Sequence, residues 1–137
     1  MKTIVLGYDD TEPSRRALER AAQLAQAFDS HLIVTSVSPI LVGAARSGGP
    51  VDSADPPEHH IEELAAARAY LDTQTIKATF VVAVGEPADT IVQIAKDRGA
   101  DLIVVGTREQ RVMRRLFGQS VSEEISHHAS CDVLIVH

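Results

Sequence analysis

Residues 3–14 read TIVLGYDDTEPS, and the change of residue types within this stretch decides the fold. The apolar run at residues 4–6 is typical of a short buried strand, and Gly7 ends it. The polar residues 9–11 and Pro13 then mark the start of a helix, because proline suits the first helical turn. The stretch therefore predicts a strand followed directly by a helix, the repeating unit of α/β proteins.

Short apolar runs and helical patterns alternate along the rest of the chain. Three of the runs, at residues 4–6, 80–84 and 102–105, are continuously apolar, which indicates burial on both faces as in a parallel sheet covered by helices. We therefore predict an α/β fold, a doubly wound five-stranded parallel sheet with helices on both faces. The expected strands are residues 4–6, 31–37, 78–84, 102–105 and 133–136, and the expected helices are residues 14–28, 58–71, 88–98 and 120–128.

The spacing of apolar residues also predicts which face of each helix is buried. In the first helix this face extends to Phe28. In the second helix the expected buried side comprises Ile61, Leu64, Ala65, Arg68 and Leu71.

Length and composition narrow the class of protein. The chain of 137 residues is 45% hydrophobic and 23% charged, which predicts one globular domain over residues 1–137. A single cysteine, Cys131, excludes an intramolecular disulfide and favours a reducing compartment, so we expect a cytoplasmic protein. No apolar run approaches the ~18 residues of a membrane span. A net charge of −6 and 4% aromatic residues argue against nucleic acid and anionic membranes as partners.

Residues 38–57 differ from the rest of the chain. They hold four prolines and three glycines with no sustained period, so we interpret them as a long mobile loop whose role the composition does not reveal.

Asp9 and Asp10 follow the first strand, at the sheet edge where doubly wound proteins bind their ligands. Adjacent carboxylates at this position suit Mg²⁺, a ribose hydroxyl or loop amides. They equally suit the N-terminus of the first helix, where aspartate complements the helix dipole. The sequence leaves both interpretations open.

The common catalytic and metal-binding motifs are missing. The first strand is followed neither by a P-loop nor by Gly-x-Gly-x-x-Gly, and no Gly-x-Ser-x-Gly elbow supplies the nucleophile of an α/β-hydrolase triad. The histidine pairs at residues 59–60 and 127–128 are sequence neighbours, which point ~100° apart on a helix. We therefore interpret them as surface histidines and Cys131 as a packed thiol, and predict no metal.

Four arginines, Arg108, Arg111, Arg114 and Arg115, lie close together in this acidic chain, beside the predicted ligand site. Guanidinium groups suit phosphate or carboxylate recognition. The alternative is a solvated loop whose arginines pair with nearby glutamates, such as Glu109.

Several segments together resemble the universal stress protein family along essentially the whole chain. They are residues 4–14, 85–87, 101–107, 120–123 and 131–137. The resemblance implies the strand order 3-2-1-4-5, homodimerisation through the last strand (residues 132–137) and a role in stress survival or regulation without a settled reaction.

One branch of this family binds ATP through the motif Gly-x2-Gly-x9-Gly-Ser/Thr. Here Gly106 matches the first glycine, whereas Glu109 and Gln119 replace the other two, and only a one-residue shift to Gly118 restores the third. The resemblance implies that Asp9 contacts the nucleoside and Ser120 the phosphate. The candidate cofactor-binding residues are Asp9, Gly106, Arg108, Ser120 and Val121.

Two functions follow. The first, which the resemblance implies, is a homodimeric regulatory or protective protein that is not an enzyme and does not bind ATP in the usual way, with another protein as a candidate partner. The second is an adenine-nucleotide-binding protein in which arginines replace the missing glycines, with Asp9 holding the nucleoside or Mg²⁺. A nucleotidyl-transfer or amide-forming enzyme is a third and weaker alternative, because the first strand lacks a phosphate loop.

Overall fold

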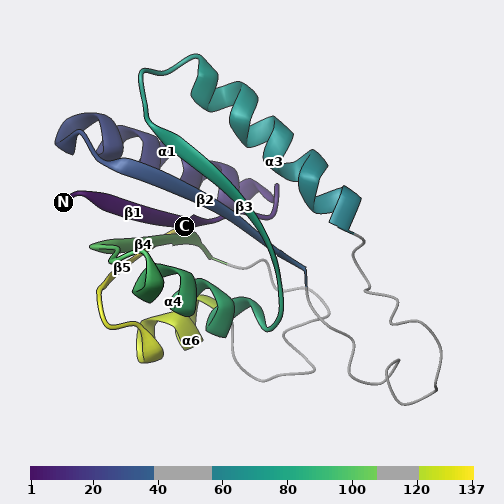
Figure 1. Ribbon diagram of the computed structural model, residues 1–137, viewed down its shortest axis with the longest axis vertical. Coiled ribbons are helices and arrows are strands. Elements are labelled where there is room, and N and C mark those ends of the chain that lie inside the picture. The colour runs from purple at the N-terminus through teal and green to yellow at the C-terminus, as the bar shows by residue number, and fades with distance from the viewer. Residues whose placement is uncertain (39–56, 108–120) are drawn as a thin grey trace.

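The computed structural model describes residues 1–38, 57–107 and 121–137. Figure 1 shows a twisted sheet with helices on both faces. The strands are β1 (Thr3–Gly7), β2 (His31–Ser38), β3 (Ala78–Val84), β4 (Leu102–Gly106) and β5 (Asp132–Val136). The helices are α1 (Glu12–Phe28), α3 (Pro57–Asp72), α4 (Pro87–Asp97) and α6 (Val121–His128).

The sheet has the order β3-β2-β1-β4-β5, and every neighbouring pair is parallel. In this register Ile4 of β1 lies opposite Leu32 of β2 and Leu102 of β4. The predicted fold class and the strand order that the resemblance implied are both confirmed.

Two hydrophobic cores lie on opposite faces of the sheet. Ile4 and Leu6 face the core under α1 and α3, whereas Val5 faces the core under α4 and α6 (Figure 1). All three side chains are fully buried. Residues 102–105 of β4 are buried as well. The prediction that residues 4–6 and 102–105 are buried on both faces is therefore confirmed, and β1 lies at the centre of the sheet.

The same prediction is wrong for the end of the third strand. Val82 and Val84 are 38% and 58% exposed. Among the described strands β3 lies at an edge of the sheet with β2 as its one neighbour, and the helices over the inner strands cover it incompletely.

The predicted face of α3 is confirmed for Leu64 and Leu71 and is wrong for Ile61, Ala65 and Arg68. Ile61 is 59% exposed and Ala65 is exposed, and Phe28 at the end of α1 is likewise exposed. The face of α3 that contacts the sheet is shifted round the helix relative to the prediction. Its buried residues are His60, Glu63, Leu64, Ala67 and Leu71.

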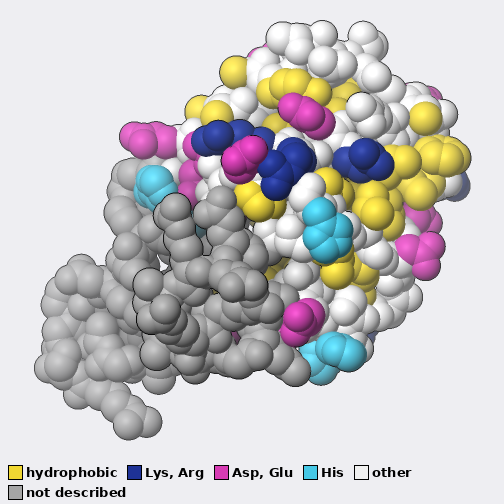
Figure 2. All heavy atoms as spheres, turned by 180° about the vertical axis from the view of Figure 1, so that it is seen from behind, with side chains coloured by type: hydrophobic (Ala, Val, Ile, Leu, Met, Phe, Trp, Pro, Cys, Tyr) yellow, Lys and Arg dark blue, Asp and Glu magenta, His cyan; other side chains and the backbone are white. Residues whose placement is uncertain are grey.

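The ends of the predicted loop at residues 38–57 belong to regular elements. Ser38 is the last residue of β2 and Pro57 is the first residue of α3, while residues 39–56 lie outside the described part of the chain. Of the helices in residues 1–38, 57–107 and 121–137, none combines the length and hydropathy that crossing a bilayer requires. On the face drawn in Figure 2, Lys and Arg side chains lie beside Asp and Glu side chains.

Candidate functional site

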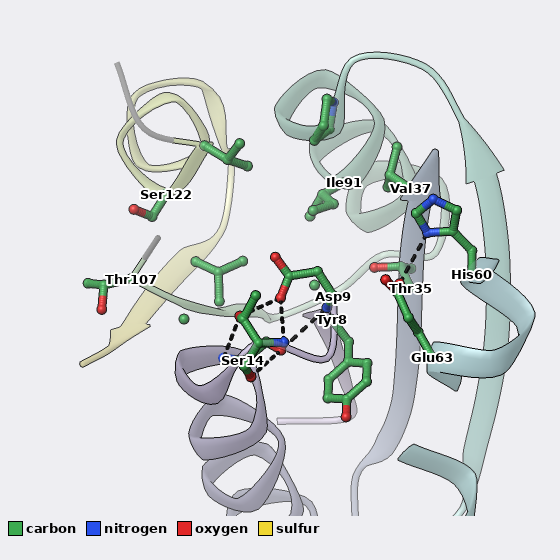
Figure 3. A pocket seen from close by; sticks show the side chains of 16 residues that line it. Tyr8, Asp9, Ser14, Thr35, Val37, His60, Glu63, Ile91, Thr107 and Ser122 are labelled. Atoms are coloured by element: carbon green, nitrogen blue, oxygen red, sulfur yellow. Dashed lines mark hydrogen bonds and ion pairs between the residues drawn. The ribbon is translucent and has the colours of Figure 1, made fainter. Parts of the chain in front are cut away.

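A cavity of about 320 Å³ lies at the carboxyl ends of β1, β2 and β4. This is the point where the strand order reverses, because β1 is followed by β2 on one side and borders β4 on the other. Figure 3 shows Asp9 near its middle, with His60 and Glu63 on one side and Thr107 and Ser122 on the other. Its apolar lining includes Val37, Pro87, Ile91, Val105 and Val121.

The turn from β1 into α1 fixes the direction of Asp9. Its Oδ1 accepts hydrogen bonds from the backbone N–H of Thr11 (3.1 Å) and from Thr11 Oγ1 (2.5 Å). Thr11 is itself the N-cap of α1, and its side chain accepts a hydrogen bond from Ser14 N at 3.4 Å. The cap of α1 is thus Thr11, and Asp9 is oriented by the cap. Within the described residues no hydrogen bond reaches Asp9 Oδ2, which leaves this oxygen for a ligand.

Asp10 has a different role. Its backbone has a φ of 59°, and its Oδ1 accepts hydrogen bonds from Tyr8 Oη (2.8 Å) and Arg15 Nε (3.1 Å). Desolvation acts to raise the pKa of Asp10, but hydrogen bonds from Arg15 and Tyr8 outweigh it and hold this pKa below its usual value. Burial and the contact with Asp10 raise the pKa of the Tyr8 hydroxyl. Asp10 does not line the cavity, so the two adjacent carboxylates do not act there as a pair.

Gly106 lies at the end of β4 against the first turn of α1. A Cβ on Gly106 would lie 2.5 Å from Pro13 C, 2.6 Å from Pro13 O and 2.8 Å from Ser14 N. These are backbone atoms that cannot move independently. Close packing of the strand against the helix therefore requires a glycine here, in addition to any approach of a ligand.

A buried polar cluster forms the wall beside β2. Glu63 Oε2 accepts a hydrogen bond from Ser36 Oγ (2.9 Å) and lies 3.1 Å from His60 Nδ1, while Ser36 Oγ is also hydrogen-bonded to His60 Nδ1. Glu63 Oε1 lies 3.1 Å from His59 Nε2. With its proton on Nδ1, His60 donates to Ser36 Oγ, and Ser36 in turn donates to Glu63 Oε2.

Sequence reasoning missed this cluster. It interpreted both histidines of the 59–60 pair as surface residues, but His60 is 3% exposed and Glu63 7% exposed, and only His59 is on the surface. The spacing of His60, Leu64, Ala67 and Leu71 follows a helical period and was an available signal. A histidine or glutamate on a helix face does not by itself indicate burial, because these residues are usually exposed.

The structure brings three of the five candidate residues together, since Asp9, Gly106 and Val121 all line the cavity. Arg108 and Ser120 lie outside the described residues, as do Glu109, Gln119 and the remaining arginines of the cluster.

The other residues considered for a metal site lie apart from the cavity. His127 and His128 are exposed, as predicted. Cys131 packs against the core under α4 and α6, and its burial raises the pKa of the thiol. Among the described residues, no group of three or more His, Cys, Asp or Glu side chains is arranged to hold a metal ion.

Comparison with known proteins agrees with the fold. Stress response protein NhaX of Bacillus subtilis (strain 168) is 30% identical to this chain, over 97% of the chain and 96% of that protein. Universal stress protein Rv1636 of Mycobacterium tuberculosis (strain ATCC 25618 / H37Rv) is 35% identical, over 99% and 96%.

Solved structures agree as well. A universal stress protein crystallised in complex with cAMP superposes with a TM-score of 0.77 at 28% identity, covering 99% of this chain and 96% of that one. The universal stress protein of Archaeoglobus fulgidus in complex with dAMP has a TM-score of 0.76 at 21% identity, covering 100% and 98%, and supports the fold alone. The sequence model described as "Universal stress protein family" matches residues 1–137. The chain therefore belongs to the universal stress protein family.

Proposed function

We propose that this protein is a non-catalytic regulatory or protective protein of the stress response, and that its cavity binds an adenine nucleotide with a single phosphate group. The observation that carries the proposal is the cavity at the strand-order reversal, with Asp9 Oδ2 available at its centre. We further propose that the protein does not bind ATP through the family's glycine motif.

The cavity has a suitable surface for each part of such a ligand. Val37 and Ile91 offer apolar walls to a purine ring. Asp9 is placed to accept hydrogen bonds from ribose hydroxyls. Thr107 and Ser122 line the cavity beside the start of α6, where the helix dipole favours an anion and Glu123 and Glu124 of the first turn oppose it. The solved structure that is 28% identical to this chain holds cAMP, a nucleotide with one phosphate.

Charge argues against a triphosphate in the cavity. Among its described lining residues two are carboxylates, Asp9 and Glu63, and none is Lys or Arg. Glu109 and Gln119 also stand where the ATP-binding branch has glycines. A carboxylate near a triphosphate in a partly desolvated site costs on the order of 1 kcal/mol or more.

Calorimetric titration tests the proposal. We expect AMP or cAMP to bind with a dissociation constant in the micromolar range, and ATP with Mg²⁺ to bind more weakly. Asp9→Asn should weaken AMP binding, whereas Asp97→Asn, at the exposed end of α4, should leave it unchanged. The absence of heat at millimolar AMP and cAMP would refute nucleotide binding.

The same titration addresses the alternative in which arginines take over from the glycines. If ATP binds more tightly than AMP, and Arg111→Ala together with Arg114→Ala abolishes that binding, the arginine-based alternative is correct and the single-phosphate proposal is wrong. Hydrolysis of the bound nucleotide would contradict the non-catalytic part of the proposal.

We also propose a cytoplasmic homodimer formed through β5. Within residues 1–38, 57–107 and 121–137, this strand pairs with β4 alone, and its central residues are apolar and partly buried. An apolar edge strand with an open side favours pairing with another chain. Sedimentation equilibrium at micromolar concentration is expected to show a dimer, and a monomer would refute this part.

A further inference from the structure

The cavity has two chemically different ends. At one end Thr107 and Ser122 lie beside α6, and at the other Glu63 and His60 extend from α3 (Figure 3). A phosphate group avoids the end that carries a carboxylate, because like charges repel strongly where water is largely excluded. A nucleotide therefore places its phosphate near the hydroxyl groups and its base near Glu63.

Glu63 is held as a hydrogen-bond acceptor. Its three polar neighbours, Ser36 Oγ, His60 Nδ1 and His59 Nε2, lie 2.9 to 3.1 Å away and are all groups able to donate. With the Nδ1 proton of His60 given to Ser36, the carboxylate of Glu63 accepts from Ser36 at Oε2 and has His59 as its neighbour at Oε1. A carboxylate accepts about four hydrogen bonds, so room for a ligand donor remains, and the crowding of Oε2 by Ser36 and His60 favours Oε1 for that donor.

We infer that Glu63 recognises a hydrogen-bond donor on the base, namely the exocyclic amino group of adenine, and that it excludes purines with a carbonyl oxygen at the same position. This inference rests on the proposed nucleotide binding and names the residue that selects the base. Ser36 and His60 act as positioning residues, because their hydrogen bonds fix the carboxylate of Glu63.

Shape and burial support this assignment. Val37 lines the cavity on the same side as Glu63, and Ile91 lies nearer its middle (Figure 3). A flat ring can pack against these apolar side chains while an amino group at its edge donates to Glu63. Because Glu63 is 7% exposed, water cannot readily replace a missing ligand donor, and a mismatched acceptor leaves two buried oxygens facing one another.

The test compares nucleotides that differ only at the base. AMP carries the amino group, purine riboside 5′-monophosphate lacks it, and IMP has a carbonyl oxygen in its place. Since the phosphate and ribose are identical, we expect AMP to bind about 10- to 100-fold more tightly than either analogue, the range for a hydrogen bond to a charged group.

Substitution of Glu63 is the second part of the test. Glu63→Gln keeps the shape but turns an amide NH₂ toward the ligand, because the amide oxygen is needed by Ser36 and His60. We expect the preference for AMP over IMP to fall by at least about tenfold. Glu62→Gln, an exposed neighbour on α3 with the same change of charge, is expected to keep the preference.

The outcomes separate the two proposals. If AMP, IMP and the unsubstituted purine nucleotide bind equally well, the role of Glu63 is refuted while nucleotide binding stands. If none of them binds, nucleotide binding is refuted and the role of Glu63 falls with it. Should Glu63→Gln fail to fold, the comparison of the three nucleotides on the unmodified protein still decides.

Discussion

Replacing Gly106 by alanine separates a packing role of this glycine from a role in ligand binding. The added Cβ would lie 2.5 to 2.8 Å from backbone atoms of Pro13 and Ser14, whereas ordinary contacts of this kind begin near 3.4 Å. The first turn of α1 must therefore move away from β4. Both elements are anchored in the core, so this movement disturbs the turn that orients Asp9.

The change in the free energy of unfolding that Gly106→Ala causes has two opposing contributions. Overpacking of this kind costs about 1 to 3 kcal/mol. Gly106 does not have a positive φ, so alanine recovers about 0.5 kcal/mol by restricting the unfolded chain. We expect a net loss of about 0.5 to 2.5 kcal/mol, which lowers the melting temperature of a domain of this size by about 2 to 9 °C.

Thermal and urea denaturation measure this loss, with Gly7→Ala as the matched control. The Cβ at Gly7 would meet Ile91 Cδ1 at 2.9 Å and Val105 Cγ1 at 3.1 Å, which are the ends of side chains and can adjust. Gly7→Ala should therefore lose less than half as much. If Gly106→Ala unfolds at the midpoint of the unmodified protein yet loses AMP binding, the packing argument is wrong and the glycine serves the ligand alone.

Three further predictions concern the polar contacts around the cavity. The pKa of Asp10 is lowered in the folded protein, so its contribution to stability is present above its unfolded pKa and is lost as the pH falls through the folded value. Lowering the pH below about 4 should therefore reduce the free energy of unfolding, measured with urea, more in the unmodified protein than in Asp10→Asn. Equal losses in the two proteins would contradict this. Thr11→Ala removes the cap of α1 and should cost about 1 kcal/mol in urea denaturation, whereas Thr11→Ser should retain most of the stability; equal effects would show that the cap hydroxyl is unimportant. Ser36→Ala takes one donor from the buried Glu63 and should cost about 1 to 3 kcal/mol in the same assay, and a loss below about 0.5 kcal/mol would mean that the cluster does not depend on Ser36.

The centre of the sheet could be predicted from the sequence because its signals are local. The runs at residues 4–6 and 102–105 are short, apolar and followed by turn residues, and both form strands buried on both faces. The order of the strands has no such local signal, since the same elements fit several arrangements. It came from the resemblance of whole segments to a known family.

Burial at the edges of the fold could not be predicted in this way. Val82 and Val84 continue an apolar run, but their exposure depends on where β3 lies in the sheet. The run alone does not distinguish an edge strand from a central one. The position of a strand is a property of the topology, so sequence patterns overestimate the burial of edge strands.

The residues of the candidate site likewise differ in whether the sequence alone predicts them. Asp9 was found because it follows a strand directly, and the fold rule places such residues at the ligand site. Glu63 lies in the middle of a helix that is remote from β1 in sequence, and only packing against β2 brings it to the cavity. Its partner Ser36 likewise has no sequence signature, since a serine inside a strand indicates nothing about its contacts.

Stability alone does not account for the buried polar face of α3. Apolar residues of similar size on such a face are often at least as stabilising as a buried ionic or hydrogen-bonded group. Leu64 and Leu71 already show that this face accepts apolar residues. The chain nevertheless has His60 and Glu63 where α3 reaches the cavity, and it supplies Ser36 from the adjacent strand to hold the carboxylate. A ligand with a hydrogen-bond donor gives this arrangement a physical reason that the packing of the core does not provide.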